Sequence, residues 1–158
     1  ATSFALEGGC VDFTGNEDID YWESVSDEVR VCTGIRRLLD AGVSKHIFTI
    51  SSDGQGSLPV FNEAGEYQGI GIGKASSLLK ELRECVLREG LPLSLALGAI
   101  TANPARILKL SSKGHVTPGF DGDICLLKKD SLELDTVIAG GRILVNRGFP
   151  VVKGTFEG

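Results

Sequence analysis

Apolar residues recur along the first half of the chain with two different periods. Residues 9–14 form a β-branched and aromatic run that is typical of a strand, and residues 46–52 form a mostly apolar run. The second run suits a strand buried on both faces, as in parallel sheets covered by helices. From Ser26, and again from Lys74 to Glu89, apolar side chains return every three or four positions, which predicts two amphipathic helices that each end at a glycine. We therefore expect two successive β/α units.

Two polar connections follow the two predicted strands. Residues 15–24 are expected to be an acidic loop, in which Tyr21 and Trp22 either line a pocket or anchor the loop. Residues 53–73 form a 21-residue connection with six glycines, and connections of this length are usually functional. Right-handed crossovers place both connections at the carboxyl ends of the strands, where barrels of this kind carry their chemistry. Two units alone cannot close a sheet, so we expect them to need the rest of a barrel.

The last third of the chain changes from helical to β character. A short helix is expected from Leu93 to Thr101, and Asn103 is expected to cap a second helical piece that ends near Leu110. Strands are then predicted at residues 114–116, 123–127, 134–139, 142–146 and 150–153, with a tight hairpin at Gly140–Gly141. The sequence thus divides into domains at residues 1–110 and 111–158, the second a small β domain.

Composition and charge exclude several classes of function. Of 158 residues, 42% are apolar and 23% charged, which is ordinary for a globular protein. The net charge of −5 and the scattered basic residues argue against nucleic acid as a partner. No apolar run approaches the ~20 residues of a membrane-spanning helix, and the start does not resemble a secretory signal, so we expect a cytoplasmic protein without a membrane partner. The four cysteines form no Cys-x-x-Cys pair and are expected to be reduced.

Asp53 is the strongest candidate for chemistry. It ends a predicted buried strand, begins the long glycine-rich connection and is the first ionisable residue after six largely uncharged positions. A carboxylate in this place suits a metal ligand and general base at a barrel rim. Alternatively, it caps the turn at Gly54. The local pattern leaves both interpretations open.

The residues around and after Asp53 match neither a calcium-binding loop nor a phosphate-binding loop. Residues 53, 55 and 57 have the spacing of a calcium loop, but the sixth and twelfth positions of that pattern hold Leu58 and Ala64. The glycines of residues 69–73 lack the spacing of a phosphate-binding loop and are expected to join the loop to its helix.

The two histidines offer little for metal binding. His46 and Asp53 stand seven residues apart on one predicted strand, about 23 Å at 3.3 Å per residue, so they cannot share a metal ion. His115 is expected on a strand of the β domain, as a surface or hydrogen-bonded polar residue.

Residues 49–57, Thr-Ile-Ser-Ser-Asp-Gly-Gln-Gly-Ser, resemble the eighth barrel strand of the isoaspartyl dipeptidases, which are binuclear zinc enzymes of the amidohydrolase superfamily. Residues 101–108 and 113–124 resemble the ending with which chains of that superfamily leave the barrel for a small β domain, and residues 151–157 resemble the end of the isoaspartyl dipeptidases in particular. The resemblance implies an α/β fold, the last βα units of a TIM-like (β/α)8 amidohydrolase barrel followed by strands of a small β-sandwich domain.

The resemblance also implies roles for single residues. Asp53 matches the eighth-strand zinc ligand, which is also the catalytic base, and Ser57 matches the serine that binds the substrate carboxylate. Gly54 and Gly56 would let the loop approach the substrate closely. The family's other zinc ligands, a His-x-His on strand one, a carbamylated lysine on strand four and histidines on strands five and six, have no match here, so zinc binding would depend on residues beyond this chain.

We therefore expect the carboxyl-terminal portion of a zinc-dependent hydrolase of β-aspartyl dipeptides, inactive without the missing amino-terminal half of the barrel. That half and further copies in a homo-oligomer are the expected partners, with a β-aspartyl dipeptide as substrate. Two alternatives remain: another amidohydrolase acting on a cyclic amide or amino-sugar amide, and a non-catalytic β-rich assembly module.

Overall fold

The computed structural model describes residues 1–15, 19–25, 28–62, 64–152 and 154, which form two compact units, Ala1–Asn103 and Pro104–Gly158. The division into domains at residues 1–110 and 111–158 stays a prediction. Within the described residues, no helix combines the length and apolar character needed to cross a bilayer.

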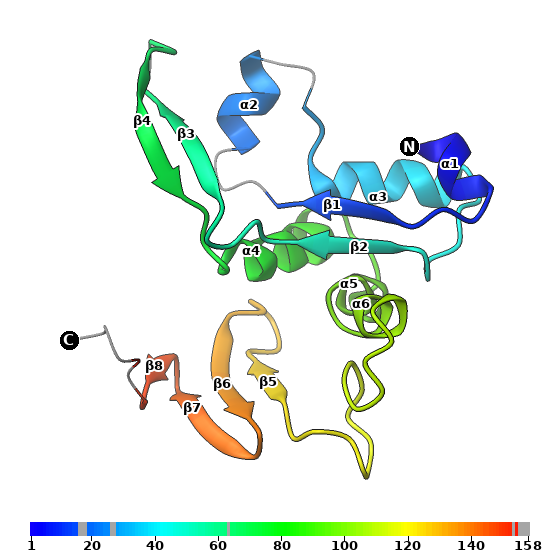
Figure 1. The fold of residues 1–158 in the computed structure, drawn as a ribbon, viewed down its shortest axis with the longest axis vertical. Coiled ribbons are helices and arrows are strands. Elements are labelled where there is room, and N and C mark those ends of the chain that lie inside the picture. Colours follow the sequence, from blue (N-terminus) through cyan, green and yellow to red (C-terminus); the bar gives the residue numbers. More distant parts are fainter. Residues whose placement is uncertain (16–18, 26–27, 63, 153, 155–158) are drawn as a thin grey trace. The chain divides into compact units, whose positions relative to one another are not determined.

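The first unit is built around a pair of parallel strands (Figure 1). Its elements are α1 (Thr2–Leu6), β1 (Val11–Thr14), α2 (Ile19–Val25), α3 (Val31–Asp40), β2 (Phe48–Ser51), β3 (Ser57–Phe61), β4 (Tyr67–Ile72), α4 (Ser77–Arg83), the π-helix η1 (Glu84–Arg88), α5 (Leu93–Ile100) and the start of α6 (Ala102–Ile107). Strand β1 pairs with β2 from Val11 opposite Phe48 to Thr14 opposite Ser51. The two predicted strands and their parallel arrangement are therefore confirmed.

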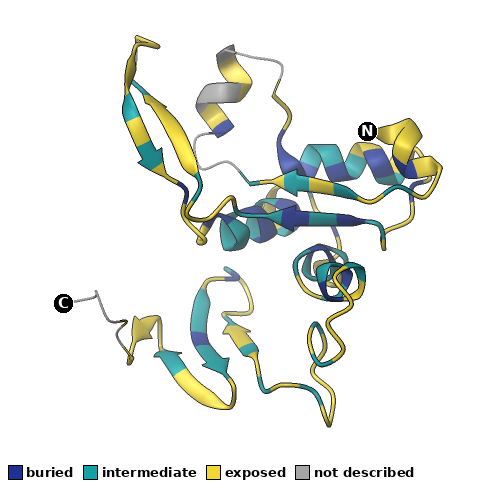
Figure 2. Ribbon diagram, in the orientation of Figure 1, coloured by how far each residue is buried: buried dark blue, intermediate teal, exposed yellow. Residues whose placement is uncertain are grey.

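The core of this unit lies on one side of the strand pair (Figure 2). Phe48 is fully buried and Ile50 is 5% exposed, and both α4 and α5 contact β2. Helix α3 covers β1 closely, because a Cβ atom added to Gly34 would lie 2.6 Å from the Phe13 ring. Thr49 and Ser51 alternate with the buried positions and are only half-buried. The expectation that this strand is buried on both faces was wrong, since polar side chains occupy its second face.

Both predicted connections contain regular structure. Residues 15–24, expected to be a loop, include most of α2, and residues 53–73 form the antiparallel hairpin β3–β4 with a bulge at Val60/Phe61. At the hairpin tip the Asn62 side chain accepts hydrogen bonds from the backbone N–H groups of Ala64 and Glu66. This turn reverses the chain between two runs with β-branched and aromatic side chains, which is why a strand pair forms despite the glycines.

The two predicted helices are present with shifted starts. The first begins at Val31 rather than at Ser26, which lies outside the described residues. The second begins at Ser77 and widens into the π-helix η1 before Gly90, whose φ of +68° ends it. Its last turn is closed by the Leu91 N–H, which donates to the Cys85 carbonyl at 2.9 Å.

Asn103 does not cap a helix as predicted. It lies inside α6, is 3% exposed, and its side-chain amide donates to the carbonyls of Lys45 and Phe48, both at 2.8 Å. The local pattern of Asn before Pro resembles a cap, but here the amide satisfies two carbonyl groups at the amino-terminal end of β2. Asn103, the last residue of the first unit, is thus linked to the central strand pair.

The second unit contains one four-stranded antiparallel sheet in its described residues, in the order β5 (Ile124–Leu127), β6 (Leu134–Ala139), β7 (Arg142–Asn146) and β8 (Phe149–Pro150). The tight hairpin at Gly140–Gly141 is confirmed, with φ of +55° and +76°. Residues 114–116 are not a strand, and the last predicted strand is shortened to two residues. A sandwich with a second sheet stays a prediction.

Candidate active site

Asp53 directly follows β2, at the carboxyl end of the parallel strand pair. Its side chain is exposed, and its backbone has a φ of +49°, while Gln55 has a φ of +69°. For residues with a Cβ atom this left-handed conformation costs about 1 kcal/mol and is held in place by its surroundings. The structure therefore puts Asp53 where the sequence predicted it, just after the carboxyl end of β2.

A closed turn carries Asp53 and Ser57. The Gly56 N–H donates to the Asp53 carbonyl at 2.9 Å, and the Gly73 N–H donates to the Gly56 carbonyl at 2.9 Å. The Gln55 N–H donates in turn to the Gly73 carbonyl at 2.9 Å. Ser57 is exposed as the first residue of β3. The turn from Asp53 to Ser57 is thus tied to the end of β4 by backbone hydrogen bonds.

The glycines of this turn are required by close packing. A Cβ atom on Gly56 would lie 2.6 Å from the Asp53 Oδ1 atom, and one on Gly73 would lie 2.3 Å from the Asp53 carbonyl oxygen. Gly54 is confined as well, because its Cβ atom would lie 3.3 Å from the Ala75 backbone. The predicted role of Gly54 and Gly56 in approaching a substrate stays a prediction, but the turn itself already needs glycine there.

The end of β2 is held from two sides. The Gly15 N–H, directly after β1, donates to the Ser51 carbonyl at 2.8 Å. The Ser77 hydroxyl, at the start of α4, donates to the Ser52 carbonyl at 3.1 Å. A Cβ atom on Gly15 would lie 3.0 Å from the Glu81 side chain, so β1 and α4 meet closely at this point. These contacts fix the strand end from which Asp53 projects.

The polar face of the strand pair carries a second carboxylate. Asp12 accepts a hydrogen bond from the Thr49 hydroxyl on Oδ1 and one from the Ser51 hydroxyl on Oδ2, both at 2.5 Å. Asp12 was not among the residues predicted from the sequence. The signal was the alternation of polar residues in both strands, Asp12 and Thr14 in β1 and Thr49 and Ser51 in β2, which places them on one face.

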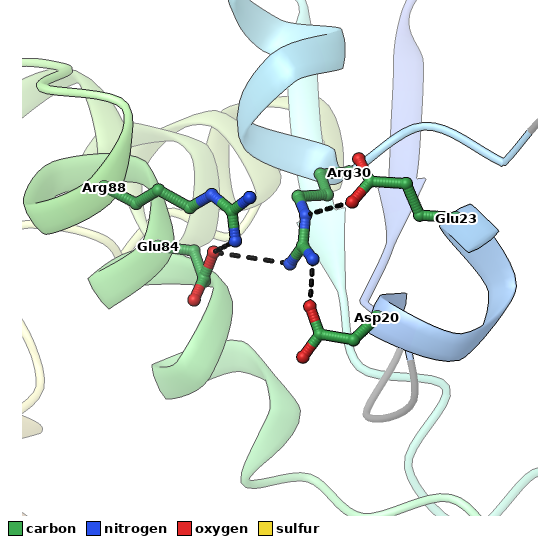
Figure 3. A network of polar contacts seen from close by, with 5 residues as sticks. All are labelled: Asp20, Glu23, Arg30, Glu84 and Arg88. Carbon is green, nitrogen blue, oxygen red and sulfur yellow. Dashed lines mark hydrogen bonds and ion pairs between the residues drawn. The ribbon is translucent and has the colours of Figure 1, made fainter.

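A network around Arg30 holds α2, the helix that follows β1 (Figure 3). Arg30 is 6% exposed and pairs with Asp20, with Glu23 at 2.9 Å and with Glu84 at 3.6 Å, while Glu84 also faces Arg88 at 3.5 Å. The hydrogen bond and charge of Arg30 lower the pKa of Asp20. The network joins α2 to η1, and the sequence did not predict it because Arg30 links two groups, Asp20 and Glu23 on one side and Glu84 and Arg88 on the other, that are far apart in the chain.

Tyr21 and Trp22 lie in α2, and their side chains are outside the described residues, so neither predicted role is tested. His46 precedes β2 and Asp53 follows it. That they do not share a metal ion stays a prediction. His115 is exposed outside any strand, with its ring edge-on to Phe120 at 6.1 Å between centroids.

The described residues do not by themselves fit a zinc ion. Among them, no three histidine, cysteine, aspartate or glutamate side chains lie close enough together to hold a metal. A catalytic zinc site takes about three protein ligands and a water molecule, whereas the rim at β2 offers the carboxylate of Asp53. What this rim offers chemically is an exposed carboxylate that can accept a proton, four residues before a serine hydroxyl.

The sequence model of the amidohydrolase family matches residues 14–144. The chain therefore belongs to the amidohydrolase family, whose structures have a TIM-barrel-type fold and whose members are generally metal-dependent hydrolases. This confirms the family resemblance that the sequence motifs indicated.

Among solved structures, two β-aspartyl dipeptidases are similar to nearly the whole chain. A β-aspartyl dipeptidase from Fervidobacterium islandicum AW-1, in complex with the β-Asp-Leu dipeptide, is 33% identical with a TM-score of 0.76, over 97% of this chain and 38% of that one. A second structure of a β-aspartyl dipeptidase from this bacterium is 29% identical with a TM-score of 0.74, over 97% of this chain and 35% of that one. An N-acetylglucosamine-6-phosphate deacetylase from Pasteurella multocida is 17% identical with a TM-score of 0.55, over 73% of this chain and 34% of that one, and shares the fold alone. This chain thus spans less than two fifths of the β-aspartyl dipeptidases.

Proposed function

We propose that the chain is the carboxyl-terminal portion of a zinc-dependent isoaspartyl dipeptidase that hydrolyses β-aspartyl dipeptides. The observation that supports this best is the turn from Asp53 to Ser57 at the carboxyl end of β2, in a chain similar over 97% of its length to a β-aspartyl dipeptidase. The fold alone would fit other amidohydrolases. The higher identity to the dipeptidases favours a dipeptide over an amino-sugar amide.

In this proposal Asp53 is the general base. Its exposed carboxylate takes a proton from the attacking water, and the resulting carboxylic acid returns that proton to the amine as the C–N bond breaks. Ser57, four residues later, donates a hydrogen bond to a substrate carboxylate. Asp53 would be this chain's ligand to a zinc ion whose other ligands lie outside the chain, and a bound zinc would supply Lewis-acid activation of the water and the carbonyl.

The test compares the natural polypeptide that carries this chain with the isolated chain. We expect the polypeptide to cleave β-Asp-Leu but not α-Asp-Leu, and the isolated chain to cleave neither, since one carboxylate does not hold a catalytic zinc. Elemental analysis should find about two zinc ions per polypeptide, as in two-metal hydrolytic sites, and none on the isolated chain.

The role of Asp53 is tested by Asp53→Asn, with Asp40→Asn at the exposed end of α3 as the matched control. We expect kcat to fall at least about a hundredfold in the first variant and to stay unchanged in the second. Full activity of Asp53→Asn would refute the assignment of Asp53 as the general base.

The same assays distinguish the alternative functions. Cleavage of a cyclic amide or amino-sugar amide in place of β-Asp-Leu would favour another amidohydrolase. The absence of both hydrolysis and bound zinc would favour a non-catalytic module.

We further propose that the protein is a cytoplasmic homo-oligomer. Two observations are compatible with this proposal: the composition is acidic, and the described residues contain no membrane-spanning helix. Sedimentation of the natural polypeptide as a single-copy species would refute the oligomer.

A further inference from the structure

The polar face of β1 and β2 is organised by one carboxylate. Each Asp12 oxygen accepts one hydroxyl hydrogen, from Thr49 and from Ser51, so the side chain spans two successive positions of the neighbouring strand on this face. The opposite face carries the apolar core with Phe48 and Ile50. In TIM-barrel-type folds the face away from the helices is turned to the barrel interior, which branched apolar side chains usually fill. A charged residue bonded to two hydroxyls there is therefore a departure that packing does not require.

Ser51 connects this carboxylate to the rim. Its hydroxyl donates to Asp12, and its carbonyl accepts from the Gly15 N–H at 2.8 Å, so both its side chain and its backbone are bound to β1 or the residue after it. Asp53 follows two residues later in a left-handed conformation that depends on its surroundings. Any rotation of the β2 end about the strand axis would be passed on directly to Asp53.

We propose that Asp12 is a positioning residue for the reaction, which fixes the end of β2 and thereby the direction of the Asp53 carboxylate. This inference rests on the proposed function of Asp53. Asp12 does not touch the reacting atoms in this assignment. It acts through Ser51, whose hydroxyl it orients by a charge-assisted hydrogen bond. Correct placement of a base matters because small misplacements of reacting groups reduce rates strongly without weakening substrate binding.

The kinetic test uses the natural polypeptide with β-Asp-Leu and the variants Asp12→Asn, Ser51→Ala and the double variant. Asparagine keeps the shape of Asp12 but removes its charge and one acceptor oxygen. We expect each single variant to lower kcat about tenfold with KM within about twofold. The double variant should be no slower than the slower single variant, because both changes break the same connection.

Asp40→Asn is the matched control, because it makes the same chemical change at an exposed helix end. It should leave kcat and KM unchanged. A merely structural role for Asp12 would lower thermal stability but leave kcat per folded molecule as in the wild type. An unchanged kcat in Asp12→Asn, or single effects that multiply in the double variant, would overturn the positioning role.

A second measurement is independent of turnover. Hydrogen exchange of the Gly15 and Gln55 amides, which close the strand end and the turn, should become about tenfold faster in Asp12→Asn. The Gly141 amide, bonded to the Gly122 carbonyl in the second unit, serves as the internal reference and should not change. If the wild-type polypeptide does not cleave β-Asp-Leu, the proposed function fails, and exchange alone decides the role of Asp12 at the strand end. Unchanged exchange at both amides overturns it.

Discussion

Replacing Gly73 by alanine is the sharpest test of the turn that carries Asp53. The added Cβ atom would lie 2.3 Å from the Asp53 carbonyl oxygen, whereas real Cβ contacts are essentially never closer than 3.0 Å. The Asp53 peptide must therefore move by at least about 0.7 Å, the difference between these two distances. A shift of that size takes the 2.9 Å hydrogen bond from the Gly56 N–H out of the normal range.

We expect Gly73→Ala to lower the free energy of unfolding by about 2 kcal/mol, from one lost hydrogen bond and the strain of a small-to-large change in a packed place. Gly98→Ala is the control. It lies in α5 with nothing within 4 Å of an added Cβ atom, so it should raise the free energy of unfolding by about 0.5–1 kcal/mol. Urea unfolding of both variants checks the pair. A Gly73→Ala variant as stable as the wild type would refute the geometry of the turn.

Three further results are expected. Arg30→Ala should lower the free energy of unfolding by about 2 kcal/mol, because it leaves carboxylates of two helices without their shared cation, and urea unfolding would contradict this by showing no change. Cys85 is fully buried and burial raises the pKa of its thiol to about 12, so mass spectrometry should find thiol reagents on exposed Cys10 but not on Cys85 until the protein unfolds. The hydrogen bond from Lys113 lowers the pKa of Asp123 below 3.8, so their interaction stabilises the protein above that pH and is lost as the pH falls through the lowered pKa. Asp123→Asn should therefore reduce the loss of stability on acidification. A loss of stability as steep as that of the wild type would count against this prediction. On the alkaline side the pKa of Lys113 is raised above 10.5, so the same interaction persists until pH exceeds that raised value.

Local patterns were sufficient for the main elements of the first unit. The period of apolar residues identified both strands and both helices, and the strand end at Asp53 followed from where the apolar run stops. The β3–β4 hairpin was missed because alternate glycines at residues 69, 71 and 73 look like a flexible loop, whereas in the fold they lie opposite or beside the side chains of β3. The π-helix was missed because its residues keep the spacing of an ordinary helix to within one position.

The candidate site was predictable only in part. Asp53 and Ser57 could be found because they are close in sequence and match a family motif, although their roles stay proposals. Asp12 could not be found in this way, because its partners Thr49 and Ser51 lie 37 and 39 residues further along the chain. Arg30 was missed because its nearer partners, Asp20 and Glu23, match no motif, and its third partner, Glu84, lies far along the chain. Hydroxyl and carboxylate groups that meet across strands leave only a weak alternation in each separate strand.

The hydrogen bond from the Asn103 side chain to the Phe48 carbonyl constrains the elements that lie between these two residues in the chain. By bonding to the carbonyl of Phe48, 55 residues earlier, it closes a loop that contains the Asp53 turn, the β3–β4 hairpin and the helices α4 and α5. This hydrogen bond acts as a non-covalent crosslink. The entropic cost of closing such a loop rises by only about 0.6 kcal/mol for each doubling of the loop length. Insertions or deletions at the hairpin tip around Asn62 should therefore be tolerated at little cost in stability. The strand β2, which Asp53 follows, remains held by Asn103 in such variants.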